Sequence, residues 1–570
     1  MLETLEKYWG YKSYRPMQQE IISEALAGRD VLAILPTGRG KSICFQVPAM
    51  MREGICIVSS PLIALMKDQV ENLKNRGIKA LAVYSGMTRS EVDYTLDNAV
   101  YGEYKFLYVS PERLSTEMFR VRLAKMNVNF IVVDEAHCIS QWGYDFRPDY
   151  LQIKQIRDIA RSGDNEDRVP VIALTATATS DVAKDIMKHL EFDKENMLVS
   201  GFERPNLSYC VRKAENKLGQ LLKLCNGVPG TGIIYVGKRK TAEEIASFLS
   251  SRGIDALPYH AGMQKKVRQA AQDAWKKGER RIIVSTNAFG MGIDKPDVRF
   301  VCHYDMPSSP EAYFQEAGRA GRDGKKSYAL LIWNDTDLKR LRQINKTMYQ
   351  PLDYIRQIYQ QVFKFLGVAY ENGAGEGYKF NLEEFCNKFK LQQAQAYYAI
   401  KYIETAGYWT LTEEIDIPSK ISITVGRDEL YNIQLNSEEL DTFIKVLMRL
   451  YPGIFNGYVT IDEEHIASFG RYSVLAVEEK LKRLNAKHIL RYIPKLRSPI
   501  ISFSCERLYE KNLRLSEKDY QDRLSRSESR AEAMVLYVTS KECRSRVLLR
   551  YFGQESDHNC GVCDYCLGVQ

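Results

Sequence analysis

Short runs of apolar and β-branched residues recur over residues 1–201, and stretches with helical spacing of apolar positions separate them. Continuous apolar runs between helical stretches are typical of buried strands in a parallel sheet. The expected strands span residues 31–35, 55–59, 79–83, 106–109, 130–133 and 171–174. Because strands and helices alternate, we predict a doubly wound α/β lobe over this part of the chain.

A second set of alternations follows a linker that we place at residues 202–207. Its expected elements are strands at 232–235, 256–259 and 282–285, with helices at 241–252 and 264–277. We therefore predict a second doubly wound lobe over residues 202–345. Two such lobes in tandem enclose a cleft, which a nucleotide can close and its hydrolysis can open.

Residues 346–515 have a different order of elements, helix, helix and strand, and this order occurs twice. The copies lie at 381–389, 391–406 and 408–411, and again at 463–469, 473–487 and 489–493. Each copy predicts a winged-helix-like α+β module, the first over 346–425 and the second over 426–515.

The second of these modules is expected to carry a β-hairpin, with strands 489–494 and 500–503 on either side of a basic turn at 495–499. Such a turn could contact phosphates or wedge open a duplex end. A scaffold or protein-contact role for the whole region is an equal alternative.

Composition changes this picture only slightly. A net charge of +8 is compatible with a polyanionic partner, but most mildly basic proteins do not bind nucleic acid. We see no apolar run of membrane-spanning length and no signal peptide at the start, so we expect a cytoplasmic protein with no membrane partner. Eight of the twelve cysteines are scattered singly, as in a reducing compartment.

The loop after the first strand has the chemistry of a phosphate site. It reads Pro-Thr-Gly-Arg-Gly-Lys-Ser at 36–42, ahead of a helix. A tight strand-to-helix loop directs backbone N–H groups at phosphate oxygens. We expect Thr37, Gly38 and Gly40 to shape the loop, Lys41 to reach the β- and γ-phosphates of ATP, and Ser42 to ligate Mg²⁺. An ordinary strand-to-helix turn is the alternative.

Two carboxylates, Asp134 and Glu135, end the strand at 130–133. At the carboxyl edge of a parallel sheet, one carboxylate can hold Mg²⁺ and the next can orient a water molecule for attack on a phosphate. Close behind them come Trp142, Phe146 and Arg147, a cluster that suits stacking on unpaired bases. A strand end followed by a buried aromatic loop is the alternative.

Several weaker candidates lie on loops. The planar side chains of Tyr11 and Arg15 could sandwich an adenine ring whose edge Gln18 reads, although Gln18 could equally cap a helix. Strand-end loops offer Ser60, Pro61 and Arg113 to a phosphodiester backbone, but each of these loop positions is more often a helix cap.

In the second lobe, Arg319 and Arg322 are three residues apart and share one face of a helical turn. An arginine supplied across a cleft stabilises the charge on a transferring phosphoryl group. We expect these two residues to complete the ATP site, in preference to a solvated basic helix end.

Four cysteines near the end of the chain have the spacing of a metal site. Thiolates at C-x16-C-x2-C-x2-C spacing can close a tetrahedral shell around Zn²⁺, and four of them leave no open position. We therefore predict a structural zinc site at Cys543, Cys560, Cys563 and Cys566, within a helical subdomain over residues 516–570.

The phosphate loop, Asp-Glu-Ala-His at 134–137 and Thr-Ala-Thr at 175–177 together resemble superfamily 2 helicases, whose lobes are RecA-like. The Gln18 setting, the aromatic loop after Glu135 and the cysteine-rich end resemble RecQ DNA helicases in particular. The resemblance implies that Glu135 activates water, Asp134 holds Mg²⁺, Arg322 is the arginine finger and Arg319 assists it. It also implies a coupling role at the nucleotide for Asp294 and DNA-backbone contacts for His260 and Thr286.

The resemblance implies an ATP-dependent 3′–5′ DNA helicase that unwinds duplex or branched DNA in recombination and repair. We expect a monomer, with single-stranded, tailed or branched DNA as its partner and a single-strand-binding protein as a candidate partner. An RNA helicase and an ATP-switched DNA-structure binder without unwinding remain alternatives.

Four features depart from the family pattern. Arg39 and Tyr144 stand where glycine and histidine are usual, and the segment 235–239 differs from the usual Cys-Asn-Ser-Arg pattern. In addition, residues 346–515 precede the zinc subdomain instead of following it.

Overall fold

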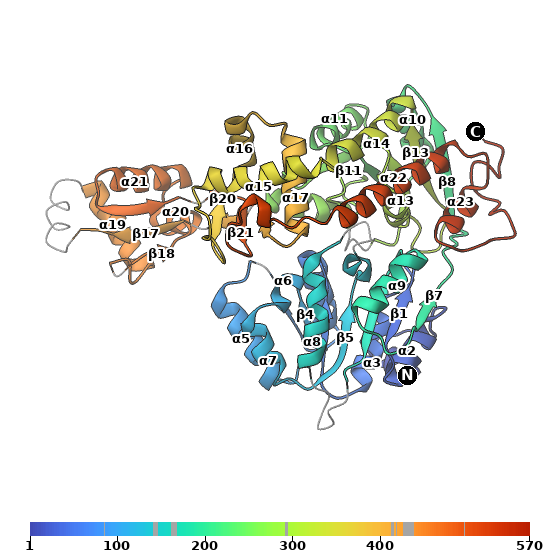
Figure 1. Cartoon of the computed structure of the whole chain (residues 1–570), viewed down its shortest axis with the longest axis horizontal. Helices are drawn as coiled ribbons and strands as arrows, with labels where there is room; N and C mark the ends of the chain where they lie inside the picture. Colours follow the sequence, from blue (N-terminus) through green and yellow to red (C-terminus); the bar gives the residue numbers. More distant parts are fainter. Residues whose placement is uncertain are drawn as a thin grey trace. The chain divides into compact units, whose positions relative to one another are not determined.

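The computed structural model describes residues 1–570 except 85, 141–145, 161–167, 291–294, 412–414, 418, 426–437, 456, 495 and 570 (Figure 1). The chain divides into two compact units. The first joins Met1–Tyr349 to Ser516–Gln570, and the second is Gln350–Leu515. Of the helices in the described ranges, none combines the length and apolarity needed to cross a bilayer.

Lobe one, residues 1–201, is built on a parallel sheet of seven described strands in the order β3-β4-β2-β5-β6-β1-β7. The strands are β1 (Val31–Ile34), β2 (Ile55–Ser59), β3 (Ala80–Val83), β4 (Phe106–Val109), β5 (Val128–Val133), β6 (Val171–Thr175) and β7 (Met197–Val199). The six predicted strands are confirmed. β7 is additional, because a run of three apolar residues is too short to predict a strand.

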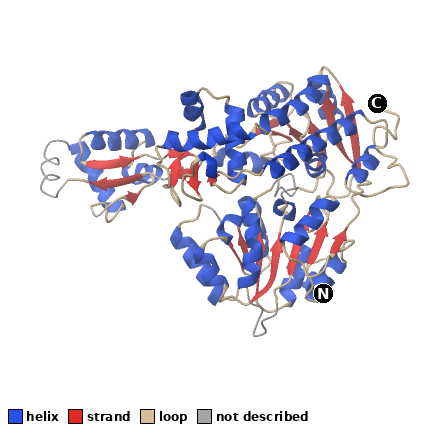
Figure 2. Ribbon diagram, in the orientation of Figure 1, coloured by secondary structure: helices blue, strands red, loops and turns tan. Residues whose placement is uncertain are grey.

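Both faces of this sheet are buried, which is why its strands are apolar throughout. Leu32 and Ile34 pack into one hydrophobic cluster, while Val31 and Ala33 pack into the other. One face is covered by α1 (Leu2–Trp9), α2 (Gln18–Leu26), α3 (Ile43–Met51) and α4 (Ile63–Asn75). The other is covered by α5 (Arg89–Tyr101), α7 (Glu117–Leu123), α8 (Ile153–Ile159) and α9 (Ser180–His189) (Figure 2).

Lobe two, residues 202–345, repeats the plan with a described parallel sheet of order β10-β11-β9-β12-β13-β8. The predicted strands are confirmed as β9 (Thr231–Tyr235), β10 (Ala256–Tyr259) and β11 (Ile282–Ser285), and the predicted helices as α11 (Arg239–Ser250) and α12 (Lys265–Lys276). Further elements are β8 (Leu207–Lys213), β12 (Val298–His303), β13 (Ser327–Trp333), α10 (Lys217–Gly227), α13 (Pro310–Ala317) and α14 (Asp335–Met348).

The C-terminal subdomain, residues 516–570, consists of α22 (Glu517–Thr539), α23 (Arg544–Tyr551) and a cysteine-rich loop that attaches to β8. The buried Asp564 carboxylate accepts hydrogen bonds from the Val211 backbone N–H at 2.8 Å and from Arg544 Nε at 3.0 Å. The Ser208 hydroxyl donates to the Val562 carbonyl. These bonds tie the end of the chain to lobe two, so the first unit is discontinuous in sequence.

The second unit contains a winged-helix module with the elements α15 (Leu352–Leu366), β14 (Gly377–Lys379), α16 (Leu382–Phe389), α17 (Gln393–Thr405), β15 (Trp409–Leu411) and β21 (Ile500–Phe503). Its sheet order is β14-β21-β15, and both pairings are antiparallel. The last strand of the chain therefore lies in the centre of this sheet.

A second winged-helix module has the elements β17 (Lys420–Ile423), α19 (Glu438–Leu450), β18 (Val459–Thr460), α20 (Glu463–Gly470), α21 (Val474–Ala486) and β19 (Leu490–Ile493). Its sheet order, β18-β17-β19, matches the first module, but here the central strand comes first in the chain. The second module is therefore a circularly permuted copy.

The two helix-turn-helix segments also agree in detail. Asn381 and Asp462 each cap a helix by accepting two backbone N–H groups, and Lys390 and Arg471 end those helices with a φ of 56°. The repeat that the sequence predicts is thus confirmed at the level of caps and turns.

A single antiparallel ribbon joins the two modules. β17 pairs with β19 from Ile423↔Leu490 to Lys420↔Ile493, and β16 (Ile415–Ile417) continues the same register against β20 (Leu496–Ser498). After a shift of one residue, β15 pairs with β21. The expected hairpin between 489–494 and 500–503 is wrong: β19 pairs with β17, and β21 completes the first module. The second module is inserted at the tip of the first module's wing.

We predict that residues 418–495 can be excised without unfolding the first module. An Asn-Gly turn would join Ile417 to Leu496, which already face each other across the ribbon. The shortened protein should keep its helical circular-dichroism signal per residue and a cooperative melt. An aggregated or molten product would show that the first module needs the second in order to fold.

Candidate functional site

The phosphate loop between β1 and α3 has the backbone conformation that its glycines permit. Gly38 and Gly40 have φ values of 85° and 78°, in the left-handed region. A Cβ on Gly40 would lie 2.7 Å from Gln18 Nε2. Both glycines are therefore required by local geometry, whereas Arg39 between them is not at a positive φ and its side chain is accommodated.

The side chains of Gln18 and Arg15 hydrogen-bond to the backbone of this loop. Gln18 Nε2 donates to the carbonyls of Arg39 and Gly40 at 3.1 and 3.0 Å, and its Oε1 accepts from the Arg15 backbone N–H at 2.9 Å. Arg15 donates to the Gly38 carbonyl. The polar atoms that we expected to read an adenine edge are engaged with the loop, and adenine reading by Gln18 stays a prediction.

Lys41 and Glu135 form the central ion pair of the site, with Nζ 3.2 Å from Oε1. They meet because β1 and β5 flank β6 in the sheet and both strands end at its carboxyl edge. Glu135 is 7% exposed and has a φ of 50°, an uncommon conformation for a non-glycine residue. Strain of this kind is concentrated at functional positions.

Asp134 is held in a different way. Its Oδ1 accepts from the Glu135 backbone N–H at 3.0 Å, its Oδ2 accepts from the Ser60 hydroxyl at 3.4 Å, and its carbonyl accepts from the Tyr150 hydroxyl at 3.0 Å. The Asp134 carboxylate and the Ser42 hydroxyl both line the same cavity. Hard oxygen donors of this kind suit Mg²⁺.

The surroundings of the two acids shift their pKa values in opposite directions. Burial and the Glu135 charge raise the pKa of Asp134 to about 6. Burial also acts to raise the pKa of Glu135, but the charges of Lys41 and His137 outweigh it and lower the pKa below its ordinary value. Glu135 is thus kept ionised, as a base must be, while a divalent cation would relieve the repulsion felt by Asp134.

His137 links Glu135 to the next strand. Its Nδ1 lies 3.1 Å from the Thr175 hydroxyl and 3.5 Å from Glu135 Oε2. The Thr175 hydroxyl in turn donates to the Thr177 carbonyl at 3.1 Å. Two segments that the sequence matched only as motifs, 134–137 and 175–177, are therefore one hydrogen-bonded unit.

A cavity of about 820 Å³ is lined by Lys41, Asp134 and Glu135 and extends to lobe two. Arg319 and Arg322 line it, opposite Lys41 and Glu135. Arg319 is 4% exposed, and its charge adds to those that lower the pKa of Glu135. The Arg322 side chain packs over Gly38, since a Cβ on that glycine would lie 3.2 Å from Arg322 Cγ. The two predicted arginines thus lie at the phosphate loop.

The linker holds the arginine turn in place. Arg204 donates to the carbonyls of Gly318 and Ala320 at 3.1 and 2.7 Å. A Cβ on Gly318 would lie 2.2 Å from Thr37 Oγ1, so this close approach of the two lobes requires glycine. Residues 202–207 are therefore more than the linker expected from the sequence, because Arg204 supports the arginine turn.

One wall of the cavity, formed by α4, was not expected from the sequence. Leu65, Gln69, Asn72 and Arg76 line it beside Tyr11. Their spacing of four, three and four residues places them on one face of α4 and the turn that follows it. The polar members of this stripe, Gln69, Asn72 and Arg76, were the available sequence signal.

The expected nucleic-acid residues fall into two groups. In lobe one, Arg147 Nη1 donates to the Pro61 carbonyl at 3.2 Å, which places Phe146, Arg147, Ser60 and Pro61 together. Arg113 instead donates to the Tyr84 carbonyl at 3.4 Å.

In lobe two, His260 and Thr286 follow the paired strand ends Tyr259↔Ser285. His260 is buried with Nε2 3.0 Å from Glu243 Oε1, and the Thr286 hydroxyl accepts from the Ala288 backbone N–H at 3.4 Å. Trp142, Tyr144 and Asp294 lie outside the described residues.

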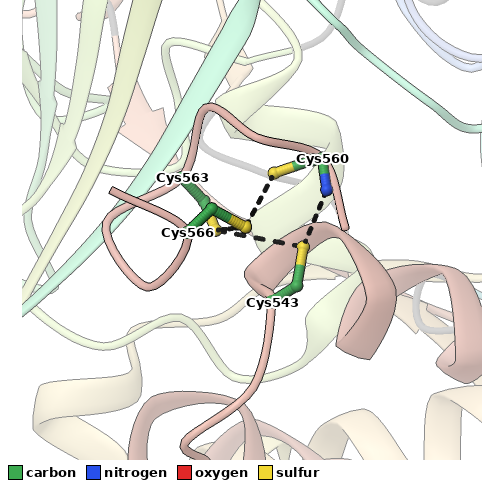
Figure 3. Close-up of side chains that lie close together, drawn as sticks. All are labelled: Cys543, Cys560, Cys563 and Cys566. Atoms are coloured by element: carbon green, nitrogen blue, oxygen red, sulfur yellow. Dashed lines mark hydrogen bonds between the residues drawn. The ribbon is translucent and has the colours of Figure 1, made fainter. Parts of the chain in front are cut away.

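The four predicted zinc ligands converge, with their sulfur atoms within 4.8 Å of one another (Figure 3). The Cys560–Cys566 and Cys563–Cys543 sulfur distances are 3.9 Å, and the Cys563–Cys566 distance is 3.4 Å. A tetrahedral Zn²⁺ with Zn–S bonds of about 2.3 Å requires sulfurs about 3.8 Å apart. A hydrogen bond from Cys563 lowers the pKa of Cys560 to about 4, which favours the metal-binding thiolate. The residues fit the metal.

Together, two parallel α/β lobes and a phosphate loop that faces arginines of the second lobe give the chain the architecture of the helicase class. Four family models match the chain. They are DEAD/DEAH box helicase at 15–186, helicase conserved C-terminal domain at 214–324, RecQ helicase winged-helix domain of Bacteroidota at 421–494, and RecQ zinc-binding at 504–567. The third runs from β17 to β19, the second winged-helix module.

The chain belongs to the RecQ helicase family. It is 40% identical over 347 residues to the probable ATP-dependent DNA helicase RecS of Bacillus subtilis, covering 60% of this chain and 68% of that protein. It is 40% identical over 367 residues to the ATP-dependent DNA helicase RecQ of Haemophilus influenzae, covering 64% of this chain and 58% of that protein. The Pasteurella multocida RecQ is 41% identical over 344 residues, 60% of this chain and 54% of its own length. The chain thus spans little more than half of these two RecQ proteins.

We predict that the purified protein contains about one zinc per chain and that Cys563→Ser loses it. Because Asp564 follows Cys563 and is bonded to β8, metal loss should also lower the melting temperature of the first unit. Elemental analysis and thermal melts would measure both effects, with Cys386→Ser in the second unit as the matched control. Full zinc content in Cys563→Ser would contradict the ligand assignment.

Proposed function

We propose that this protein is an ATP-dependent 3′–5′ DNA helicase that translocates on single-stranded DNA and unwinds duplex or branched DNA in recombination and repair. The observation that carries the proposal is the single cavity in which Lys41 and Glu135 of lobe one face Arg319 and Arg322 of lobe two. An ATPase site shared by two lobes converts phosphate chemistry into lobe movement.

In this mechanism, the Lys41–Glu135 ion pair is exchanged on ATP binding. The γ-phosphate attracts the Lys41 ammonium, and the Glu135 carboxylate is released to orient a water molecule for in-line attack. Because Lys41 and His137 keep Glu135 ionised, it can accept a hydrogen bond from that water. Ser42 and Asp134 would hold Mg²⁺, which supplies charge neutralisation at the phosphates when bound.

Arg319 and Arg322 stabilise the charge that develops on the transferred phosphoryl group. Both come from lobe two, so the transition state is favoured only while the lobes are close. Loss of the γ-phosphate removes the anion that these arginines and Lys41 share. The closed arrangement of the lobes is then no longer the more stable one, and the lobes separate.

Movement along DNA follows if the lobes hold the strand at different places. Ser60, Pro61, Arg147 and Phe146 offer one set of backbone and stacking contacts, and His260 and Thr286 offer another on lobe two. The relatives above are named as ATP-dependent DNA helicases, which supports DNA as the substrate. A monomeric state and a single-strand-binding-protein partner stay predictions from the resemblance.

We expect Lys41→Ala to reduce the ATPase rate by at least about 100-fold, because the positive charge opposite the γ-phosphate is lost. DNA affinity, measured by fluorescence anisotropy, should change little. Lys240→Ala, an exposed position on α11, is the control and should hydrolyse ATP at the wild-type rate. An ATPase rate near wild type in Lys41→Ala would refute the site.

Strand separation tests the proposed function directly. With ATP and Mg²⁺, the protein should unwind a duplex with a 3′ single-stranded tail and not one with a 5′ tail. Glu135→Gln should unwind neither, because the amide cannot act as the base. Unwinding of only the 5′-tailed duplex would overturn the polarity, and equal unwinding of a 3′-tailed RNA duplex would favour an RNA helicase.

A further inference from the structure

Helix α22 of the C-terminal subdomain lies along lobe two. Three polar contacts hold it there: Arg342 to Glu532 at 2.7 Å, Ser527 to Asn345 at 2.8 Å, and Arg530 to Glu311 at 3.4 Å. Tyr520 adds an edge-on contact with Tyr349, with ring centroids 6.3 Å apart. These contacts fix the position of α22 with respect to lobe two.

Near its N-terminal end, α22 also reaches lobe one. The Arg523 guanidinium lies 5.8 Å from the centroid of the Phe146 ring, within the range of a cation–π interaction. Phe146 is the first described residue after 141–145, in the aromatic segment that follows Glu135. Arg523 is half-buried, so its charge is less screened than that of an exposed arginine.

The segment that carries Phe146 is tied to the catalytic acids. The next residue, Arg147, donates its backbone N–H to the Cys138 carbonyl at 2.9 Å, and its own carbonyl accepts from the Tyr150 N–H at 3.1 Å. The Tyr150 hydroxyl donates to the Asp134 carbonyl at 3.0 Å. A displacement of Phe146 is therefore transmitted over few bonds to the residue beside Glu135.

We infer that Arg523 is a positioning residue that holds Phe146, and through it Arg147 and Tyr150, and so couples DNA binding to ATP hydrolysis. The inference deepens the proposed function and rests on it. Arg523 touches neither nucleotide nor acid. It acts because α22 is fixed to lobe two while Phe146 belongs to lobe one, so relative movement of the lobes makes or breaks this contact.

This role differs from simple packing in what it predicts. A packing residue would affect stability and all activities together. A positioning residue should leave hydrolysis without DNA unchanged and lower only the stimulation by DNA. Because the contact is a cation–π pair, lysine should substitute in part and methionine, which has similar length but no charge, should not.

The test compares Arg523→Met and Arg523→Lys with wild type in ATPase assays with and without single-stranded DNA. We expect Arg523→Met to keep the DNA-free rate and to lose about three- to tenfold of the DNA-stimulated rate, from the usual strength of such pairs. Arg523→Lys should recover part of the loss. In a Phe146→Leu background, Arg523→Met should cause no further loss of stimulation.

Lys518→Met, an exposed position on the first turn of α22, is the matched control and should behave as wild type. Zinc content and melting temperature report whether each variant is folded. Wild-type stimulation in Arg523→Met, or additive losses in the double variant, would overturn the inference. An absence of DNA stimulation in the wild-type protein would instead count against the proposed function.

Discussion

The ion pair between Lys41 and Glu135 sets the geometry on which the whole first unit depends. Each partner ends a strand of the same parallel sheet, so the pair forms only if β1 and β5 keep their places on either side of β6. Two opposite charges in a buried position need each other, because either one alone would carry an uncompensated desolvation cost. In the proposed mechanism a triphosphate rearranges the same charges, so ATP would replace the interaction that orders the site.

Lobe two and the C-terminal subdomain are organised around a second buried group, Asp564. It lies in the sequence between two zinc-ligand cysteines, and its carboxylate accepts a hydrogen bond from the backbone of β8. Asp564 therefore connects the cysteine cluster to the lobe-two sheet. Helix α22 of the same subdomain contacts lobe one through Arg523 and Phe146. This contact changes when the two lobes move relative to each other, which is the physical basis for the role inferred for Arg523.

The region between lobe two and the zinc site shows why strand pairing is hard to derive from sequence. The helix-turn-helix signals are local, and both copies were predicted from the repeated order of helix, helix and strand. The partner of β21 is far along the chain in β15, and the sequence nearest to it, β19, is bound elsewhere. Inserting a permuted copy does not change the hydrophobic pattern of the individual strands. The pattern therefore predicts the strands correctly, but it favours a hairpin between the neighbouring strands β19 and β21, which do not pair.

The sequence by itself determined the two α/β lobes, the phosphate loop and the four-cysteine cluster, because periodicity, glycine placement and ligand spacing are local properties. It also supplied candidates for the phosphate loop, the two acids and the arginines of the proposed ATP site, but it did not reveal the role of Arg204 or the residues of α4 that line the cavity. Only the tertiary structure decided that Gln18 braces the phosphate loop, that Arg322 packs on Gly38, and that Arg523 meets Phe146. These contacts join residues far apart in the chain, and their formation depends on how packed elements meet in space.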